Sequence, residues 1–480
     1  VVAAVRLGAR GYDVTVLEQL DAPGGRAYVL RQDGFTFDTG PTIVTAPYLF
    51  EELWQLCGRR MADDVAFTPM EPFYRLQFND GSTFDCSSDP AAMRAEVKRL
   101  SPDDVAGYER FLKVSEESYR LGFQQLGHVP FDSWQDMAKV APAMIRQQAY
   151  RSLHSVAASH VRDPRLRFAL SFHPLFVGGN PFNVTAVYGL IHYLERKHGV
   201  HFAMGGTGAL VKGLVSLIEG QGNAVRYRAK VDEIIVERGR AIGVRLTSGE
   251  VIRSDIVVSN ADVAHTYRQL LRSTVRNRWP DRKLDRARYS MSLFVWYFGT
   301  RRRYDDVPHH TILLGPRYRE LLHDIFERKV LADDFSLYLH RPTATDPSLA
   351  PTGCDTFYVL SPVPNLAGEV DWKTAAEPYR RRIAQRLSET LLPDLEANVV
   401  SSALTTPLDY RDRLLSHLGN AFGMEPVLLQ SAWFRPHNRC KDVDRLYLVG
   451  AGTHPGAGLP GVLSTARVLD IVVPDASALA

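Results

Sequence analysis

An acidic residue that ends a short apolar strand, followed by a glycine-rich turn, is the pattern with the clearest chemistry. Residues 14–17 (Val-Thr-Val-Leu) alternate as a buried strand does, Glu18 follows them, and residues 21–26 (Asp-Ala-Pro-Gly-Gly-Arg) form the turn. At this place in a doubly wound sheet an acid binds a dinucleotide ribose, and glycines let the backbone approach a pyrophosphate. Each feature alone is also common in ordinary strands and turns. Together they predict a nucleotide site, which comprises Glu18, Gly24, Gly25 and Arg26.

A second glycine-rich loop lies near the other end of the chain. Residues 446–453 read as a buried strand that runs into 456–461 (Gly-Ala-Gly-Leu-Pro-Gly), and Val462 begins a helical pattern. Such a loop and helix start direct backbone N–H groups at a polar ring edge, as a flavin presents on its N1/O2 side when it is reduced. An ordinary strand-to-helix turn is the alternative. A cofactor that reaches from Glu18 to this loop must be long, which predicts FAD.

Two further turns fit the same site less specifically. Residues 35–41 (Phe-Thr-Phe-Asp-Thr-Gly-Pro) alternate as a strand and break at Gly40 and Pro41, which suits either the lining of a cofactor edge or a surface hairpin. The Gly-Gly-Thr-Gly at 205–208 precedes a helical pattern and is weak evidence by itself. Three strands are predicted after it, at 231–236, 241–246 and 251–258.

Composition limits the class of protein. A length of 480 residues predicts two or three domains, and 45% hydrophobic with 23% charged residues is typical of a globular chain. A net charge of +3 gives no support for nucleic-acid binding. The four cysteines, at 57, 86, 354 and 440, form no Cys-x-x-Cys pair, which favours a reducing compartment and predicts no metal site.

No run of apolar residues is long enough to predict a membrane-spanning helix, and the start does not read as a signal peptide. Any membrane contact is therefore expected to be peripheral. Residues 1–7 already follow a helical pattern, so we expect a first strand and a Gly-x-Gly-x-x-Gly turn upstream of the given sequence.

The fold predicted is α/β: a discontinuous Rossmann-like FAD-binding domain, a mixed α/β substrate domain and a helical subdomain. The FAD-binding domain is assigned residues 1–65, 201–265 and 440–480. The substrate domain is assigned 66–100 and 266–439, with aromatic strands at 293–298, 335–339 and 356–360. The helical subdomain is assigned 101–200.

Two segments of the helical subdomain are candidates for contact with apolar molecules. Residues 137–161 mix Met, Ala, Ile and Leu with basic residues, which suits either a helix on a bilayer surface or, as the favoured interpretation, a helix packed on its own domain. Residues 168–182 are aromatic and interrupted by glycines. They are expected to line an apolar pocket or to form a core connection.

The whole chain resembles the bacterial and fungal phytoene desaturases. The likeness lies in Pro-Gly-Gly-Arg-Ala at 23–27, Phe-Asp-Thr-Gly-Pro at 37–41, Gly-Gly-Thr-Gly-Ala-Leu at 205–210, Ser-Asn-Ala-Asp at 259–262 and the loop 448–462. Two other segments, Phe-His-Pro-Leu-Phe-Val-Gly-Gly-Asn-Pro-Phe at 172–182 and Gln-Ser-Ala-Trp-Phe-Arg-Pro-His at 430–437, make the resemblance specific within the flavin amine-oxidase relatives. The tail after Ser464 is less similar and puts the last helix in doubt.

The resemblance implies non-covalently bound FAD and the desaturation of phytoene to lycopene or neurosporene. It also implies a peripheral position on the cytoplasmic face of a membrane, with oxygen or a quinone as electron acceptor; the oligomeric state is left open. By position, Glu18 would hold the adenosine ribose, Val231 the adenine through its backbone, and Gly452, Gly461 and Val462 the flavin end.

Desaturation removes a hydride and a proton from adjacent carbons, and the polyene stabilises the cation in between, so a strong base is not required. Asp136 and Lys139 are weak candidates for handling the proton, although a surface ion pair is the favoured interpretation. His173 is a third weak catalytic candidate, and a hydrogen-bonded core histidine is the more frequent role for such a residue.

Two alternative functions remain open at this point. One is a flavin oxidase of an amine or a porphyrinogen on the same fold. The uncharged segment 168–182 argues against an amine as the substrate. The other is a non-catalytic isoprenoid carrier. Flavin absorbance in the purified protein distinguishes an enzyme from a carrier.

Overall fold

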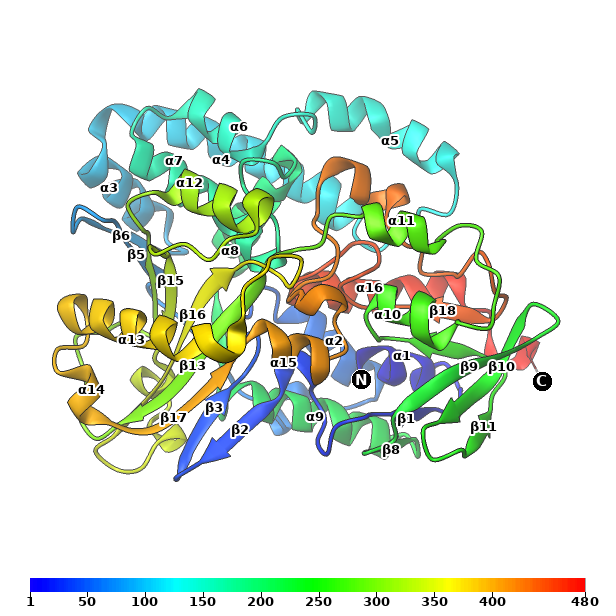
Figure 1. Ribbon diagram of the computed structural model, residues 1–480. Helices are drawn as coiled ribbons and strands as arrows, with labels where there is room; N and C mark the ends of the chain where they lie inside the picture. The colour runs from blue at the N-terminus through cyan, green and yellow to red at the C-terminus, as the bar shows by residue number, and fades with distance from the viewer. Residues whose placement is uncertain (480) are drawn as a thin grey trace.

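The computed structural model describes residues 1–479, and these form a broad molecule in which three regions adjoin (Figure 1). Short parallel strands with helices occupy one side, a seven-stranded sheet the other, and a layer of helices from residues 90–198 covers both. The outcome is the α/β class with the helical subdomain that the sequence predicts.

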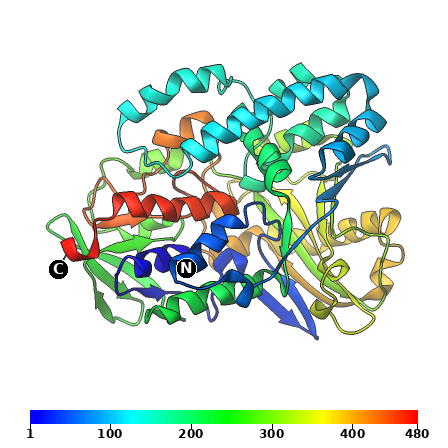
Figure 2. The same ribbon diagram turned by 180° about the vertical axis from the view of Figure 1, so that it is seen from behind.

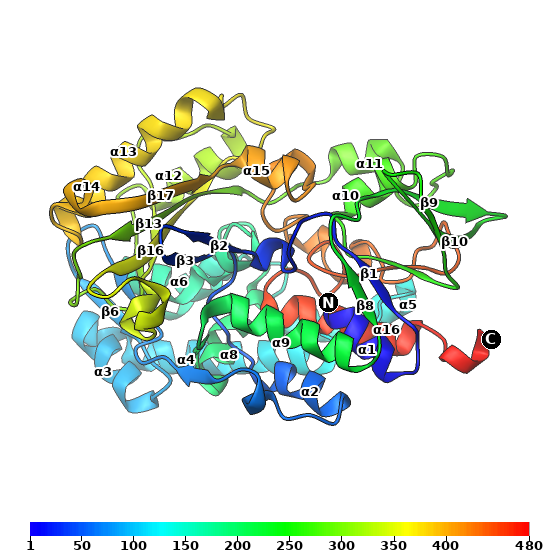
Figure 3. The ribbon, with the colours of Figure 1, turned by 90° about the horizontal axis from the view of Figure 1, so that it is seen from below.

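The first region contains two pairs of parallel strands covered by helices. The strands are β1 (Thr15–Leu17) with β8 (Ala224–Arg226) and β12 (Val257–Ser259) with β18 (Leu446–Leu448); the helices are α1 (Val2–Ala9), α2 (Tyr48–Leu56), α9 (Gly206–Gly220) and α16 (Leu459–Val472). Helices α1, α9 and α16 lie side by side next to the pair of β1 and β8 (Figures 2 and 3). Ion pairs from Arg6 of α1 to Asp470 of α16 and to Glu52 reinforce the packing.

The doubt about the last helix was wrong, because α16 continues through Val472 with Leu463, Val468 and Leu469 buried. The prediction of a strand at 251–258 was also wrong in one respect. The segment divides into β11 (Val251–Arg253), which completes an antiparallel sheet with β9 (Val231–Glu237) and β10 (Arg240–Leu246), and β12, which joins the parallel pair.

The second region is a seven-stranded sheet in the order β17-β13-β16-β15-β14-β5-β6. Its strands are β5 (Tyr74–Gln77), β6 (Thr83–Cys86), β13 (Ser292–Thr300), β14 (His310–Leu313), β15 (Leu337–His340), β16 (Asp355–Val363) and β17 (Val399–Thr405). The hairpin between β5 and β6 turns at residues 79–81, with Gly81 at a φ of 82°. Two-stranded sheets complete the chain: β2 (Val29–Gln32) with β3 (Phe35–Asp38), and β4 (Phe67–Pro69) with β7 (His201–Ala203).

Strand β13 contributes one face to the hydrophobic core and the other face to the wall of a cavity. All nine of its residues are buried. Because side chains alternate between the faces of a strand, Phe294, Trp296 and Phe298 pack with residues of α13 (Trp372–Thr390), whereas Leu293, Val295 and Tyr297 face the opposite side, where a cavity lies. Burial of each large apolar side chain contributes about 1.5–3 kcal/mol.

The helical layer consists of α3 (Pro90–Leu100), α4 (Val105–Ser118), α5 (Trp134–Arg146), α6 (Leu153–His160), α7 (Pro164–Ser171) and α8 (Leu190–His198). The single helix expected near 137–161 is in fact two. Helix α6 buries Leu153, Val156 and Ala157, whereas no residue of α5 is buried. Packing on the protein's own domain is therefore confirmed for α6, whereas contact of α5 with a bilayer surface stays a prediction.

Short helices complete the chain: α10 (Val263–His265), α11 (Asp281–Arg286), α12 (Tyr318–His323), α14 (Leu395–Asn398) and α15 (Pro407–Asp412). None of the helices within residues 1–479 has the length and apolar character that crossing a bilayer requires.

Candidate functional site

Glu18 lies at the carboxyl end of β1, where its backbone is fixed on both sides. Its N–H donates to the carbonyl of Arg226 at 2.9 Å, and its carbonyl accepts from the N–H of Ala229 at 2.8 Å. One carboxylate oxygen accepts from the N–H of Leu20 at 2.8 Å. The other oxygen makes no hydrogen bond within the part of the chain that the structure describes, so the half-buried side chain is oriented and still able to accept from a ligand hydroxyl.

Val231 begins β9 close to this acid, because Ala229 two residues earlier pairs with Glu18. Its backbone is therefore near the carboxylate, as a contact to a base next to a ribose requires. The role in adenine binding stays a prediction.

The turn after β1 is shaped by glycine. Gly24 and Gly25 have φ values of 120° and 55°, a region that favours glycine. A Cβ atom at Gly25 would meet no described atom within 4 Å, so open space adjoins this backbone. Arg26 then donates from Nε to the carbonyl of Ala421 at 2.9 Å and from Nη2 to Oγ of Ser416 at 2.6 Å. Its guanidinium lines the cavity, and burial lowers its pKa.

The strand before Gly40 brings a second charged group to the site. Asp38 is 4% exposed, and its Oδ2 accepts from the N–H of Thr207, at the start of α9, at 3.0 Å. The glycine-rich start of α9 thus binds Asp38 through a backbone N–H group. Burial raises the pKa of Asp38 to about 6, against the hydrogen bonds from α9, which lower it. Gly40 and Pro41 line the cavity beside it.

A buried arginine holds the glycine loop at 450–461. Arg435 is 1% exposed and donates to three backbone carbonyls, those of Gln430 at 3.1 Å, Met424 at 3.0 Å and Ala451 at 2.8 Å. Charged donors make the stronger kind of hydrogen bond, so this side chain fixes the loop. The sequence segment containing Arg435 carried the family resemblance, but its role was not predicted.

Gly461 and Val462 line the cavity at the first turn of α16, and their contact with the flavin end of a cofactor stays a prediction. Gly452 does not line the cavity: a Cβ atom there would lie 2.4 Å from Cγ2 of Val263. Its glycine is required for packing against α10, so the structure gives no support for a direct contact with a cofactor.

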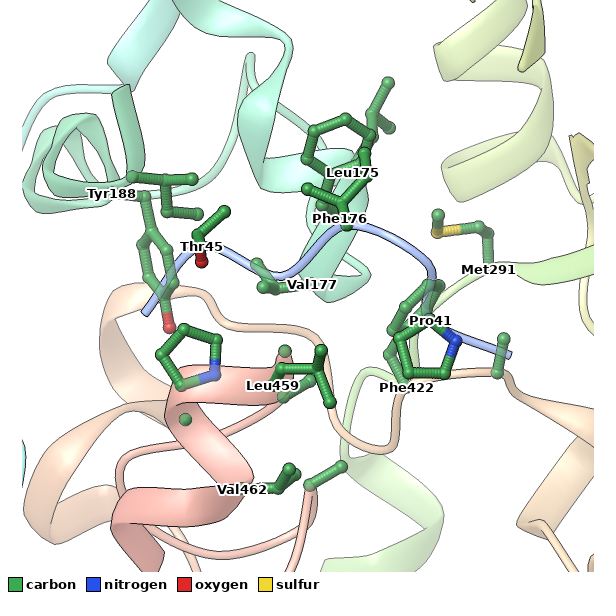
Figure 4. Close-up of a pocket in the computed structure, with 18 of the residues that line it drawn as sticks. Pro41, Thr45, Leu175, Phe176, Val177, Tyr188, Met291, Phe422, Leu459 and Val462 are labelled. Atoms are coloured by element: carbon green, nitrogen blue, oxygen red, sulfur yellow. The ribbon is translucent and has the colours of Figure 1, made fainter. Parts of the chain in front are cut away.

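One cavity joins this loop to the seven-stranded sheet, with a volume of about 480 Å³. The inward residues of β13 form one wall, α8 and the segment Leu175–Val177 form another, and Met137, Val140 and Met144 of α5 cover a third side. Around the end near the loop, Pro41, Met291, Phe422 and Leu459 point into the same space (Figure 4). The prediction that segment 168–182 lines an apolar pocket is confirmed.

The three catalytic candidates lie outside this wall. Asp136 caps α5 together with Ser133, and its Oδ1 is 3.9 Å from Nζ of Lys139, whose side chain is 77% exposed. Hydrogen bonds from Ser133 lower the pKa of Asp136. This geometry favours the surface ion pair. His173 is buried and hydrogen-bonded to Tyr74, with its Nε2 at 3.1 Å from the phenol oxygen, as expected for a core histidine.

Three buried histidines meet behind the wall, a feature that the sequence did not predict. His310 and His340 are opposite each other in β14 and β15, and Nε2 of His309 is 3.0 Å from Nε2 of His340. In ligand type and spacing the three rings could hold a metal ion. Nδ1 of His310 instead pairs with the hydroxyl of Tyr338, a cavity residue, at 2.7 Å. The expectation of no metal site stays a prediction.

Comparison with known proteins places the chain in a family. The model of the flavin-containing amine oxidoreductases matches residues 1–468. A neurosporene-forming phytoene desaturase of Cereibacter sphaeroides is 52% identical over 479 residues, which are 99% of this chain and 92% of that protein. A lycopene-forming phytoene desaturase of Paracoccus is 48% identical over 465 residues, 97% of this chain and 93% of that protein.

Solved structures agree on the fold. An oxidoreductase from Methanosarcina mazei superposes with a TM-score of 0.62 at 17% identity, over 98% of this chain and 97% of that one. A putrescine oxidase bound to putrescine superposes with a TM-score of 0.63 at 13% identity, over 98% and 96% of the two chains. The α/β architecture with its discontinuous first region is therefore that of flavin amine oxidases.

Proposed function

The chain belongs to the family of flavin-containing amine oxidoreductases, and we propose that within this family it is a phytoene desaturase. It removes hydrogen from adjacent carbons of a C40 polyene, and its product is neurosporene or lycopene. The observation that carries the proposal is the cavity, in which the glycine loop of the first region meets a wall of aliphatic and aromatic side chains. Most of that wall is apolar and suits a hydrocarbon.

FAD is the form of flavin that we propose. The two ends of the site differ as the two ends of FAD do. At one end are an acid, Glu18, with one oxygen that no residue among 1–479 pairs, and a turn with open space at Gly25. At the other end a glycine loop opens into the apolar cavity. The positively charged guanidinium of Arg26 also suits the binding of the pyrophosphate of FAD. The residues that would hold FAD are Glu18, Gly24, Gly25, Arg26, Gly40, Pro41, Val231, Gly461 and Val462.

A bound flavin supplies a two-electron acceptor for a hydride. The side chains of this protein do the positioning: Pro41, Met291 and Phe422 surround the end of the cavity near the glycine loop and keep it dry (Figure 4). A dry, shaped site holds the reacting carbons in place and excludes competing reactions with water. Because a polyene delocalises positive charge, the site needs no strong base.

Membrane contact through α5 is part of the proposal. Met137, Val140 and Met144 of this helix face the cavity, whereas Trp134 and Ile145 are 65% and 66% exposed. Tyr150 and Leu429 add to the exposed apolar side chains, at 68% and 70%. An apolar surface directly over an apolar cavity suits a peripheral enzyme that takes its substrate from the bilayer. We propose the cytoplasmic face as its location and oxygen or a quinone as the electron acceptor.

The test is the reaction itself. The purified chain, loaded with FAD, is incubated with liposomes that contain phytoene, first with oxygen and then with a soluble quinone under nitrogen. Formation of a coloured conjugated polyene, resolved by chromatography, is the expected result, and its dependence on each acceptor identifies the oxidant. A flavin-loaded preparation that leaves phytoene unchanged with both acceptors would overturn the proposal. A colourless protein that still extracts phytoene from the liposomes would instead support an isoprenoid carrier.

A further inference from the structure

The segment that follows α15 contacts both sides of the glycine turn at 21–26. Before the turn, Nε2 of Gln19 donates to the carbonyl of Arg413 at 2.6 Å. At its end, Arg26 donates to a hydroxyl and to a carbonyl of the same segment. Residues 413–421, from the other side of the cavity, therefore lie against the turn that is expected to approach a pyrophosphate.

The guanidinium of Arg26 is already engaged with this segment. Its Nε donates to the carbonyl of Ala421 at 2.9 Å, and its Nη2 donates to Oγ of Ser416 at 2.6 Å. A guanidinium binds a phosphate or a carboxylate best with two parallel N–H groups. Because the edge formed by Nε and Nη2 is occupied by the protein itself, Arg26 offers a ligand its charge and only part of its fork.

A second guanidinium, that of Arg413, lines the same cavity and is not engaged. The backbone N–H and carbonyl of Arg413 take part in hydrogen bonds, whereas its side chain makes none among residues 1–479 and forms no ion pair there. Its Cζ lies 4.8 Å from the centre of the ring of Tyr28, two residues after Arg26. An aromatic face attracts a guanidinium and leaves its N–H groups available, so Arg413 is held beside the turn with its fork open.

The two guanidinium groups act on one point of the cavity wall. Burial raises the pKa of Tyr410 to about 12, and the charges of Arg26 and Arg413 both lower it, whereas the exposed Asp409 raises it. The phenol thus lies within range of both positive charges. Two like charges that share a partly buried site repel each other, and an anion with two negative charges relieves that repulsion. The diphosphate of FAD is such an anion.

We propose that Arg413 is a binding residue for the diphosphate of FAD and supplies the second positive charge of the site, next to that of Arg26. Its open fork provides the paired N–H groups that Arg26 has given to the protein, and its place beside the glycine turn puts them where the pyrophosphate is expected. The inference rests on the proposed FAD and adds to it the group that recognises its phosphates.

The experiment measures the affinity for FAD of the flavin-free native chain, Arg413→Leu and Arg413→Lys by quenching of flavin fluorescence. We expect Arg413→Leu to raise the Kd about thirtyfold, which corresponds to about 2 kcal/mol at 1.4 kcal/mol per tenfold. Arg413→Lys keeps the charge without the fork, so its Kd should rise only about fivefold. The matched control is Arg411→Leu, because Arg411 lies on α15 and already pairs with Asp412. Its Kd should stay within about twofold of the native value.

Displacement of FAD by ADP and by adenosine separates the role of the charge from a role in folding. Arg413→Leu should weaken binding of ADP by about the same factor as FAD and leave adenosine unchanged, because only ADP carries the diphosphate. If Arg413→Leu does not fold, Arg413→Gln carries the same expectation.

An unchanged Kd for FAD in Arg413→Leu would overturn the inference and leave the proposed cofactor and reaction intact. Equal losses for ADP and adenosine would also overturn it, since a distorted site would then be the cause. If the native chain binds no FAD, the proposed cofactor fails and this inference fails with it.

Discussion

The two ends of the cavity are built in opposite ways. At the glycine-loop end, Arg26 and Arg435 are enclosed and donate to the backbone or to a hydroxyl. At the end covered by α5, the helix has no buried residue, and its apolar side chains face either the cavity or solvent.

The difference indicates which end of the cavity requires a precisely fixed geometry. Charged donors on backbone carbonyls fix a loop within a narrow range of geometries, as a site that aligns a cofactor with a carbon requires. A helix with few buried contacts opens at low cost, as entry of a long hydrocarbon requires. Substitutions should therefore lower stability most at the glycine-loop end and least at α5.

The largest expected effect is that of Arg435→Leu. Three carbonyls lose a charged donor, and the free energy of unfolding should fall by roughly 3 kcal/mol or more. Urea denaturation and the flavin content of the purified protein measure it. Arg439→Leu is the matched control, because Arg439 donates to a single carbonyl, that of Val472, and its loss should cost about 1 kcal/mol. Equal losses in the two variants would contradict the comparison.

The buried carboxyl of Asp38, at the glycine-loop end, should make the free energy of unfolding depend on pH. Its pKa is raised to about 6 in the folded chain, so the folded state keeps a proton that the unfolded state loses between about pH 4 and 6. Stability from this group is therefore present at low pH and is lost as pH rises through that window, by an amount on the order of 2 kcal/mol. Asp38→Asn lacks this dependence. Its unfolding free energy minus that of the native chain should increase from pH 4 to 6.5, and a flat difference would refute the assignment.

Asp136→Ala should have a smaller effect, confined to α5. The capping box with Ser133 is lost, and the helix should be destabilised by about 1 kcal/mol. Hydrogen exchange of the α5 amides should accelerate about fivefold while exchange in α6 stays unchanged. If Asp136 instead handles the proton of the reaction, turnover of phytoene would fall by roughly a hundredfold or more, and the surface role would be wrong.

The smallest effect on stability belongs to Trp134→Ser combined with Ile145→Asp. Both side chains are exposed, so the unfolding free energy should change by less than about 0.5 kcal/mol per site. Flotation with anionic liposomes should show at least about a tenfold loss of binding, because two apolar contacts with the bilayer are removed. The control is Val275→Ser, which removes an apolar side chain that is 79% exposed outside α5. Equal binding by all three proteins would refute the membrane role of α5.

Local pattern predicted much of the site. The alternation at 14–17 and 35–38 gave strands β1 and β3, and the aromatic segment 168–182 gave part of the cavity wall. These features depend on neighbours in sequence. The role of Arg435 depends on three carbonyls that are brought to it by folding, and no local pattern distinguishes such a residue from a surface charge.

Gly452 and the segment 137–161 also show that a local sequence pattern does not determine which contacts a residue makes in the folded protein. The glycine belongs to a motif that suggests a cofactor contact, yet its close neighbour is Val263, 189 residues earlier in the chain. The apolar composition of 137–161 is shared by a packed half and an exposed half. Composition does not say which side of a helix finds a partner.

The sequence by itself therefore determined the family, the flavin, the α/β class and the strands of the cofactor region, because glycine turns and alternation are properties of the local backbone. Only the tertiary structure decided which groups share the cavity. An aspartate, Asp38, that accepts from the start of α9, and an arginine, Arg26, that donates to the carbonyl of Ala421, depend on contacts between segments far apart in the chain. Burial and hydrogen bonding, which set their chemistry, do not exist before the chain has folded.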